Sequence, residues 1–164
     1  VYESTGCDAV KIEGGAHMAD TVSLLNRNGI AVMSHIGLKP QFSRFMGGYK
    51  VSGRGEEGAR EVLNDARALV EAGAVLLLVE GTISAVANQV ALGTDVPVIG
   101  IGAGAGIDGQ VLVWSDMCGF FTEFRPKFVK RYLDGAELVK GAVREYAREV
   151  KEGGFPSEEF EYKQ

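Results

Sequence analysis

Three side chains that can move protons or bind cations, Glu13, His35 and Glu80, each stand at the end of a short apolar segment. The clearest segment is Ala74 to Gly81, A-V-L-L-L-V-E-G, in which Glu80 is the only charged residue. A run this short and apolar is typical of a parallel strand buried on both faces. Ligands bind at the carboxyl ends of such strands, which makes Glu80 a candidate general base. The alternative is a glutamate that stabilises the first turn of the following helix.

The arrangement around Glu80 recurs in the chain. Glu13 is the seventh residue after Gly6 and Glu80 is the seventh after Gly73, and each glutamate is followed by glycine. His35 is the sixth residue after Gly29. Because the carboxyl ends of parallel strands meet at one edge of a sheet, we expect Glu13, His35 and Glu80 to lie along the same edge.

Lys11 and Glu13 are two residues apart in a strand, so their side chains point to the same face. Burying either ion without a partner costs several kcal/mol, and a metal or an anionic substrate would be a suitable partner. The alternative is an edge strand with one solvated face. His35 taken alone is either a hydrogen-bond donor to a substrate or a histidine of the core.

Strand and helix patterns alternate along the chain, as in a parallel α/β fold. An open doubly wound sheet and a (β/α)8 barrel both give this alternation. Eight barrel units usually need about 200 to 250 residues, so five units would form the later part of a barrel. Strands are predicted at 7–13, 30–35, 74–81, 97–102 and 110–114, and helices at 18–29, 56–72, 83–91, 126–133 and 136–152.

Two glycine-rich segments are candidates for ligand contact. The connection from Gly37 to Gly55 is too long for an ordinary loop, and its Lys50 and Arg54 could bind an anion or simply be solvated. The pattern G-x-G-x-x-G from Gly104 to Gly109 precedes a predicted strand instead of a helix, so it is not a dinucleotide site. It indicates a loop where the backbone comes close to a ligand.

The composition excludes several classes of protein. The chain has 164 residues, 46% of them hydrophobic, and a formal net charge of −5, which argues against nucleic acid or a membrane as a partner. It has no apolar run long enough to span a membrane, and its first residues do not resemble a signal peptide. Two cysteines, Cys7 and Cys118, suit a reducing, cytoplasmic setting.

Several of these stretches resemble the ketopantoate hydroxymethyltransferase family of the phosphoenolpyruvate/pyruvate barrel superfamily. The motifs that carry the resemblance are V-K-I-E-G-G from Val10, H-I-G-L-K-P-Q from His35, G-G-Y-K-V-S-G-R-G from Gly47, L-L-V-E-G from Leu77 and P-V-I-G-I-G-A-G from Pro97. They follow the family's order over nearly the whole chain. The resemblance implies a (β/α)8 TIM barrel, of which residues 1–164 would be a single domain supplying about the last five βα units and the C-terminal helices. The first three units would be missing.

The resemblance also implies a reaction. A divalent metal, usually magnesium, would hold 3-methyl-2-oxobutanoate, and the enolate of this 2-oxo acid would take a hydroxymethyl group from methylenetetrahydrofolate. Carried over by motif, Glu80 is the proton acceptor, Lys11 and His35 bind substrate, and Glu13 belongs to the metal site. The family implies a cytoplasmic enzyme that forms a large homo-oligomer. Two alternatives are a metal-dependent lyase or mutase acting on a 2-oxo acid, and a non-catalytic half-barrel that serves in binding or assembly.

Overall fold

The computed structural model describes residues 2–42, 48 and 50–163. The chain divides into two compact units, Val1–Val111 and Leu112–Gln164. The expectation of a single domain stays a prediction. No helix in the described part of the chain is long and apolar enough to cross a membrane.

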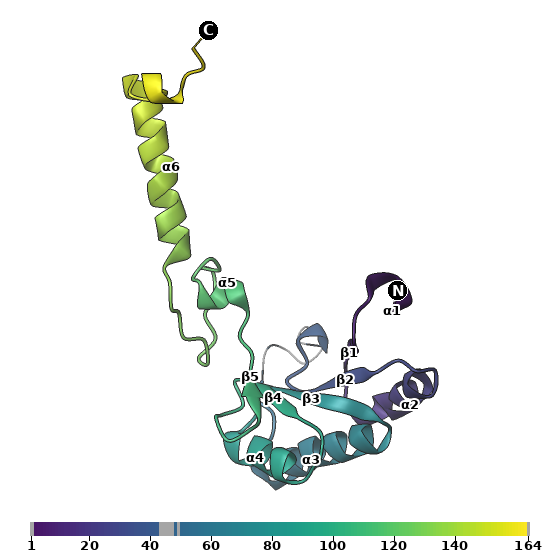
Figure 1. Ribbon diagram of the computed structural model, residues 1–164. Helices are drawn as coiled ribbons and strands as arrows, with labels where there is room; N and C mark the ends of the chain where they lie inside the picture. The colour runs from purple at the N-terminus through teal and green to yellow at the C-terminus, as the bar shows by residue number, and fades with distance from the viewer. Residues whose placement is uncertain (1, 43–47, 49, 164) are drawn as a thin grey trace. The chain divides into compact units, whose positions relative to one another are not determined.

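The first unit is built on a parallel sheet whose strands pair in the order of the sequence, β1-β2-β3-β4-β5. A helix leads from each of the first three strands to the next, and the last two strands are joined without a helix (Figure 1). The strands are β1 (Val10–Glu13), β2 (Val32–Gly37), β3 (Ala74–Glu80), β4 (Val98–Ile101) and β5 (Gly109–Gln110). The helices of the unit are α1 (Tyr2–Thr5), α2 (Ala19–Arg27), α3 (Gly55–Glu71) and α4 (Ser84–Leu92), with 3-10 turns η1 (Ala16–Met18) and η2 (Pro40–Phe42).

Helices α2, α3 and α4 all lie on one side of the strands (Figure 1). Consecutive strand order with helices on one side is the winding of a barrel, because a doubly wound sheet reverses its order and carries helices on both faces. Of the two alternatives that the sequence left open, the structure therefore supports the barrel.

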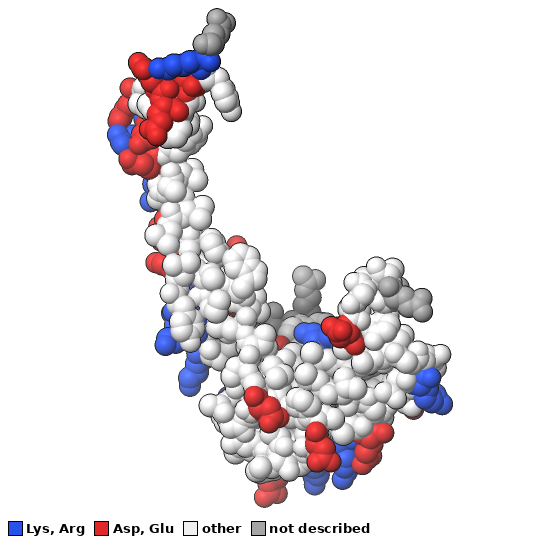
Figure 2. Space-filling view, viewed as in Figure 1, with Lys and Arg blue, Asp and Glu red and all other residues white. Residues whose placement is uncertain are grey.

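The core of this unit lies between the sheet and its helices. Alternate residues of the strands, among them Val32, Ile36 and Leu77, are fully buried there against the apolar stripes of the helices. Helices α2 and α3 end as predicted, with Gly29 and Gly73 in the positive-φ region just after them. Acidic and basic side chains are mixed on the outer surface (Figure 2).

The second unit contains α5 (Trp114–Met117), α6 (Gly135–Glu152) and the 3-10 turn η3 (Glu158–Phe160). Helix α6 agrees closely with the helix predicted at 136–152. Exposed ion pairs line it: a hydrogen bond from Lys140 holds the pKa of Glu137 below its usual value, and one from Arg148 does the same for Glu145. Such exposed pairs stabilise a helix only slightly.

Two predicted elements of the C-terminal part are wrong. Residues 126–133 form no helix. Val129 N–H makes a single-turn bond to the Pro126 carbonyl at 3.0 Å, but the N–H of Tyr132 donates to the carbonyl of Met117 in α5 at 2.8 Å instead of continuing a helix. The last strand is also shorter than the predicted 110–114. Its final ladder bond joins Val111 N–H to the Gly100 carbonyl at 2.9 Å, and helix α5 begins at Trp114.

Candidate functional site

The sheet register brings the predicted site residues to one edge. Glu13 on β1 lies opposite His35 on β2, and Glu80, the last residue of β3, lies opposite Gly37 at the end of β2. All three strands are parallel, so their carboxyl ends share this edge. The predicted convergence of Glu13, His35 and Glu80 is thus seen in the structure.

The imidazole of His35 lies between the two carboxylates. Its Nδ1 is 3.4 Å from Glu13 Oε2, and its Nε2 is 3.2 Å from Glu80 Oε2. His35 is only 2% exposed, whereas the carboxylates of Glu13 and Glu80 are 17% and 16% exposed. The ring nitrogens do not reach hydrogen-bond geometry with a partner in the described residues, so the contacts are electrostatic and are ion pairs when the ring is protonated.

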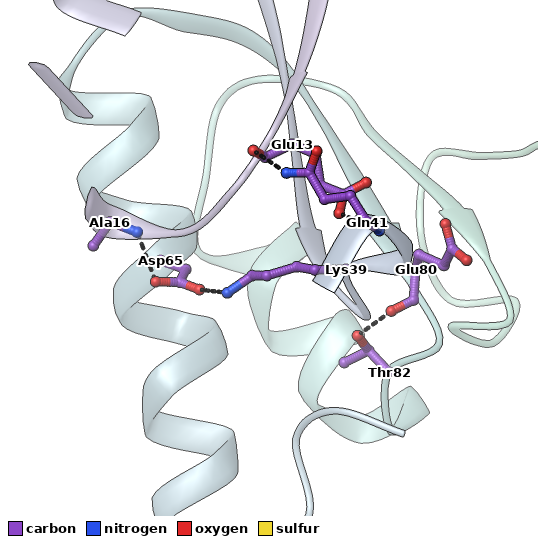
Figure 3. A network of polar contacts seen from close by, with 7 residues as sticks. All are labelled: Glu13, Ala16, Lys39, Gln41, Asp65, Glu80 and Thr82. Atoms are coloured by element: carbon purple, nitrogen blue, oxygen red, sulfur yellow. Dashed lines mark hydrogen bonds and ion pairs between the residues drawn. The ribbon is translucent and has the colours of Figure 1, made fainter. Parts of the chain in front are cut away.

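Glu13 is further held by Gln41, which the sequence interpretation did not single out. The backbone N–H of Gln41 donates to Glu13 Oε1 at 3.2 Å, and its side-chain amide donates to the Glu13 carbonyl at 3.4 Å (Figure 3). Gln41 lies in the connection between Gly37 and Gly55, so part of this predicted functional loop does reach the site. Residues 43–47 and 49 of the loop lie outside the described residues.

The backbone of Glu80 is fixed from two sides. Its carbonyl accepts hydrogen bonds from the Thr82 hydroxyl at 2.9 Å and from the Leu38 N–H at 2.8 Å. Gly37 lies against the same carbonyl: a Cβ there would be 2.4 Å from the Glu80 oxygen, and its φ is +86°. Glycine at position 37 is therefore needed for the two strand ends to approach each other.

Lys11 shares the face of Glu13 but is exposed. The described residues place no carboxylate within ion-pair distance of its ammonium group, which leaves the charge available to an anionic ligand. Lys50 and Arg54 are exposed as well. No three His, Cys, Asp or Glu side chains of the described residues are grouped as ligands of one metal ion.

The glycine run after β4 lies against a helix. A Cβ at Gly104 would be 2.6 Å from Ser84 Cβ, and one at Gly106 would be 2.6 Å from Asn88 Oδ1. Both neighbours belong to α4. The close backbone approach predicted for this loop is therefore explained by packing on α4, with no need of a ligand.

A buried aspartate also lies close to the site. Asp65 on α3 accepts a hydrogen bond from the Ala16 N–H at 2.7 Å and another from Lys39 Nζ at 3.3 Å (Figure 3). Gly15 adjoins it so closely that a Cβ there would lie 2.4 Å from both carboxylate oxygens. Neither Asp65 nor Lys39 was singled out from the sequence.

Gly15→Ala should therefore lower the free energy of unfolding by about 1 to 3 kcal/mol, because the new methyl group displaces a buried carboxylate. Chemical denaturation of the two proteins measures the difference. Gly141→Ala is the matched control: Gly141 lies within α6 with open space around it, and alanine there should keep or raise stability. Equal stabilities of Gly15→Ala and the unsubstituted protein would contradict the packing described for Asp65.

The family is settled by comparison with known proteins. The model of a family described as ketopantoate hydroxymethyltransferase matches residues 1–158. The chain belongs to the ketopantoate hydroxymethyltransferase family. The resemblance found in the motifs is confirmed.

Similar members of the family cover nearly all of this chain. A 3-methyl-2-oxobutanoate hydroxymethyltransferase from Campylobacter fetus subsp. fetus is 61% identical over 162 residues, which are 99% of this chain and 61% of that protein. One from Wolinella succinogenes is 58% identical over 98% of this chain and 62% of that protein. The chain thus spans about three fifths of the length of these curated relatives.

A solved structure shares the fold. The crystal structure of phosphonopyruvate hydrolase superposes with a TM-score of 0.50 at 15% sequence identity, over 99% of this chain and 57% of that one. Likeness at this identity concerns the fold alone. Together with the consecutive parallel strands, it confirms the predicted (β/α)8 barrel class, with this chain supplying part of the barrel.

Proposed function

We propose that the protein containing this chain transfers a hydroxymethyl group from methylenetetrahydrofolate to 3-methyl-2-oxobutanoate and so forms ketopantoate. The observation that carries the proposal is the 61% identity, over nearly the whole chain, to an enzyme of that name. Family membership supports this transferase over the lyase or mutase and over the non-catalytic module. The activity is assigned to the full-length protein because the chain spans only part of its relatives.

A divalent metal fits the residues present. Magnesium prefers oxygen ligands and is commonly held by one or two carboxylates together with waters and the substrate. Glu13 would hold it, because its carboxylate lies at the strand end and remains partly exposed. When bound, a magnesium ion would polarise the keto oxygen of the 2-oxo acid and stabilise negative charge there.

Three residues of this chain have different roles at the substrate. Glu80 takes the C3 proton of 3-methyl-2-oxobutanoate, and C3 of the resulting enolate forms a bond to the one-carbon unit of the folate. Water supplies the hydroxyl oxygen of the new group, and both C–N bonds to the one-carbon unit break as tetrahydrofolate is released. Lys11 binds the anionic substrate and stabilises charge that develops on it. His35, 3.2 Å from Glu80 and 3.4 Å from Glu13, keeps both carboxylates turned toward the same edge of the sheet and contributes to the substrate site.

The direct test of this function is product formation. The full-length protein with Mg²⁺, methylenetetrahydrofolate and 3-methyl-2-oxobutanoate should yield ketopantoate, detected by mass spectrometry. Omitting the metal or the folate should stop the reaction. A protein that consumes the 2-oxo acid without the folate would favour a lyase instead. The cytoplasmic location and the large homo-oligomer stay predictions, which cell fractionation and analytical ultracentrifugation can test.

Lys11→Ala should weaken binding of 3-methyl-2-oxobutanoate about tenfold or more while the fold is kept. Lys11 is exposed, so its removal costs little packing, whereas loss of its charge removes a charge-assisted contact with the substrate carboxylate. Isothermal titration calorimetry in the presence of Mg²⁺ measures the affinity. Lys151→Ala in α6 is the control and should bind normally. Loss of folding in Lys11→Ala would instead support a structural role for this lysine.

A further inference from the structure

Asp65 is a buried charged residue for which the proposed function has no role. It is 7% exposed, and carboxylates are rarely buried so far without partners. Its partners come from two different loops: Oδ1 accepts from the Ala16 N–H and Oδ2 from Lys39 Nζ. Figure 3 shows Asp65 on its helix, with Ala16 on one side of the carboxylate and Lys39 reaching it from the other.

These two loops are the ones that follow the strands of Glu13 and His35. Ala16 comes three residues after Glu13, and Lys39 comes four residues after His35. One carboxylate of α3 therefore ties the turn after β1 to the segment after β2. Gly15, which has no side chain to interfere, allows the carboxylate to lie directly against the turn.

The segment after β2 in turn contacts Glu13. Lys39 is joined to Gln41 through Pro40, whose ring fixes one backbone dihedral and stiffens the link. Gln41 gives Glu13 two hydrogen bonds, one to the carboxylate and one to the carbonyl. A continuous path therefore runs from the Asp65–Lys39 ion pair through Pro40 and Gln41 to the Glu13 carboxylate.

We propose that Asp65 and Lys39 are positioning residues that hold Glu13 in its working orientation through Gln41 and the turn at Ala16. The proposal rests on the proposed function for the role of Glu13. It also accounts for Gly15, Lys39 and Gln41, which belong to the family motifs but have no direct part in the chemistry proposed above. If the pair only stabilised the fold, its removal would lower the melting temperature and leave turnover by the folded protein unchanged.

The kinetic test uses Lys39→Met, which keeps the length of the side chain and removes its charge, and Asp65→Asn, which can still accept from the Ala16 N–H. In the full-length protein each variant should lower kcat about 10- to 100-fold, the usual effect of losing a residue that orients a metal-site ligand. The KM for the folate should change little, and circular dichroism should show that both variants are folded at the temperature of the assay. Lys39→Arg should recover most of the activity, and the double variant should be no slower than the slower single one.

A second measurement does not depend on activity. Amide hydrogen exchange at Gln41, followed by NMR, should become at least tenfold faster in Lys39→Met and Asp65→Asn, while the amides of Ala16 and β3 keep their protection. Glu61→Gln, an exposed carboxylate one turn earlier on α3, should alter neither exchange nor kcat.

The outcomes separate this proposal from the proposed function. If the unsubstituted full-length protein makes no ketopantoate, the proposed function fails, and the exchange measurement still decides whether Asp65 and Lys39 hold Gln41 in place. Unchanged exchange at Gln41 overturns the proposal. So does a lower melting temperature with normal kcat in Lys39→Met and Asp65→Asn.

Discussion

Glu80→Gln should slow exchange of the C3 proton of 3-methyl-2-oxobutanoate with deuterated water by about 10²- to 10⁴-fold. Glutamine keeps the size of the side chain and its place at the end of β3, but its amide cannot take up the proton. Proton NMR of the 2-oxo acid, incubated with the full-length protein and Mg²⁺ in deuterated water, follows the exchange directly. Because no folate is needed, the measurement isolates proton removal from the transfer of the one-carbon unit.

Glu71→Gln is the matched control for this experiment. Glu71 is the last residue of α3 and is exposed, so the same chemical change there should leave the exchange rate as it is. The two variants should also melt at similar temperatures, since Glu80 is held mainly through its backbone carbonyl. Exchange at the normal rate in Glu80→Gln would remove Glu80 from the role of general base.

His35→Leu should lower the free energy of unfolding by about 1 to 3 kcal/mol, the usual cost of leaving buried polar groups without their partner. Leucine fills much the same volume, but it leaves the carboxylates of Glu13 and Glu80 facing an apolar side chain. We also expect C3 exchange to slow at least tenfold, because the two carboxylates lose the group that lies between them. Urea denaturation and the NMR exchange assay measure the two effects.

The other histidine of the chain provides the control for His35→Leu. His17 is exposed, so His17→Leu should change stability by no more than about 0.5 kcal/mol. If His35→Leu were as stable and as active as the unsubstituted protein, the contacts of the imidazole with Glu13 and Glu80 would have no energetic importance.

The part of the site that the sequence predicted is the part encoded within single strands. A buried parallel strand is recognisable as a short apolar run, and a polar residue at its end must lie at the carboxyl edge of the sheet. Glu80 follows such a run, whereas Glu13 and His35 end more mixed segments and stand, like Glu80, at the sixth or seventh position after a glycine. The convergence of these three residues could be predicted from the strand pattern alone, because parallel strands in consecutive order place equivalent ends side by side.

The residues that the sequence did not reveal act through contacts between distant parts of the chain. Asp65 stands in a regular helix pattern, and its partner Ala16 is 49 residues away. Gln41 is 28 residues from Glu13 and lies in the connection between Gly37 and Gly55, which has no periodic pattern that would predict its contacts. The helix predicted at 126–133 is wrong for a related reason, because local helical spacing could not predict that Tyr132 would bond to Met117.

The consecutive order of the strands also bears on how the first unit forms. Each strand pairs with the next strand along the chain, so no pairing has to wait for a distant segment to be brought in. Apart from the connection between Gly37 and Gly55, the loops that must close are short, and the entropy lost on closing them is correspondingly small. Among proteins with parallel sheets, this arrangement has a low contact order, which favours rapid folding by successive addition of one strand and its helix.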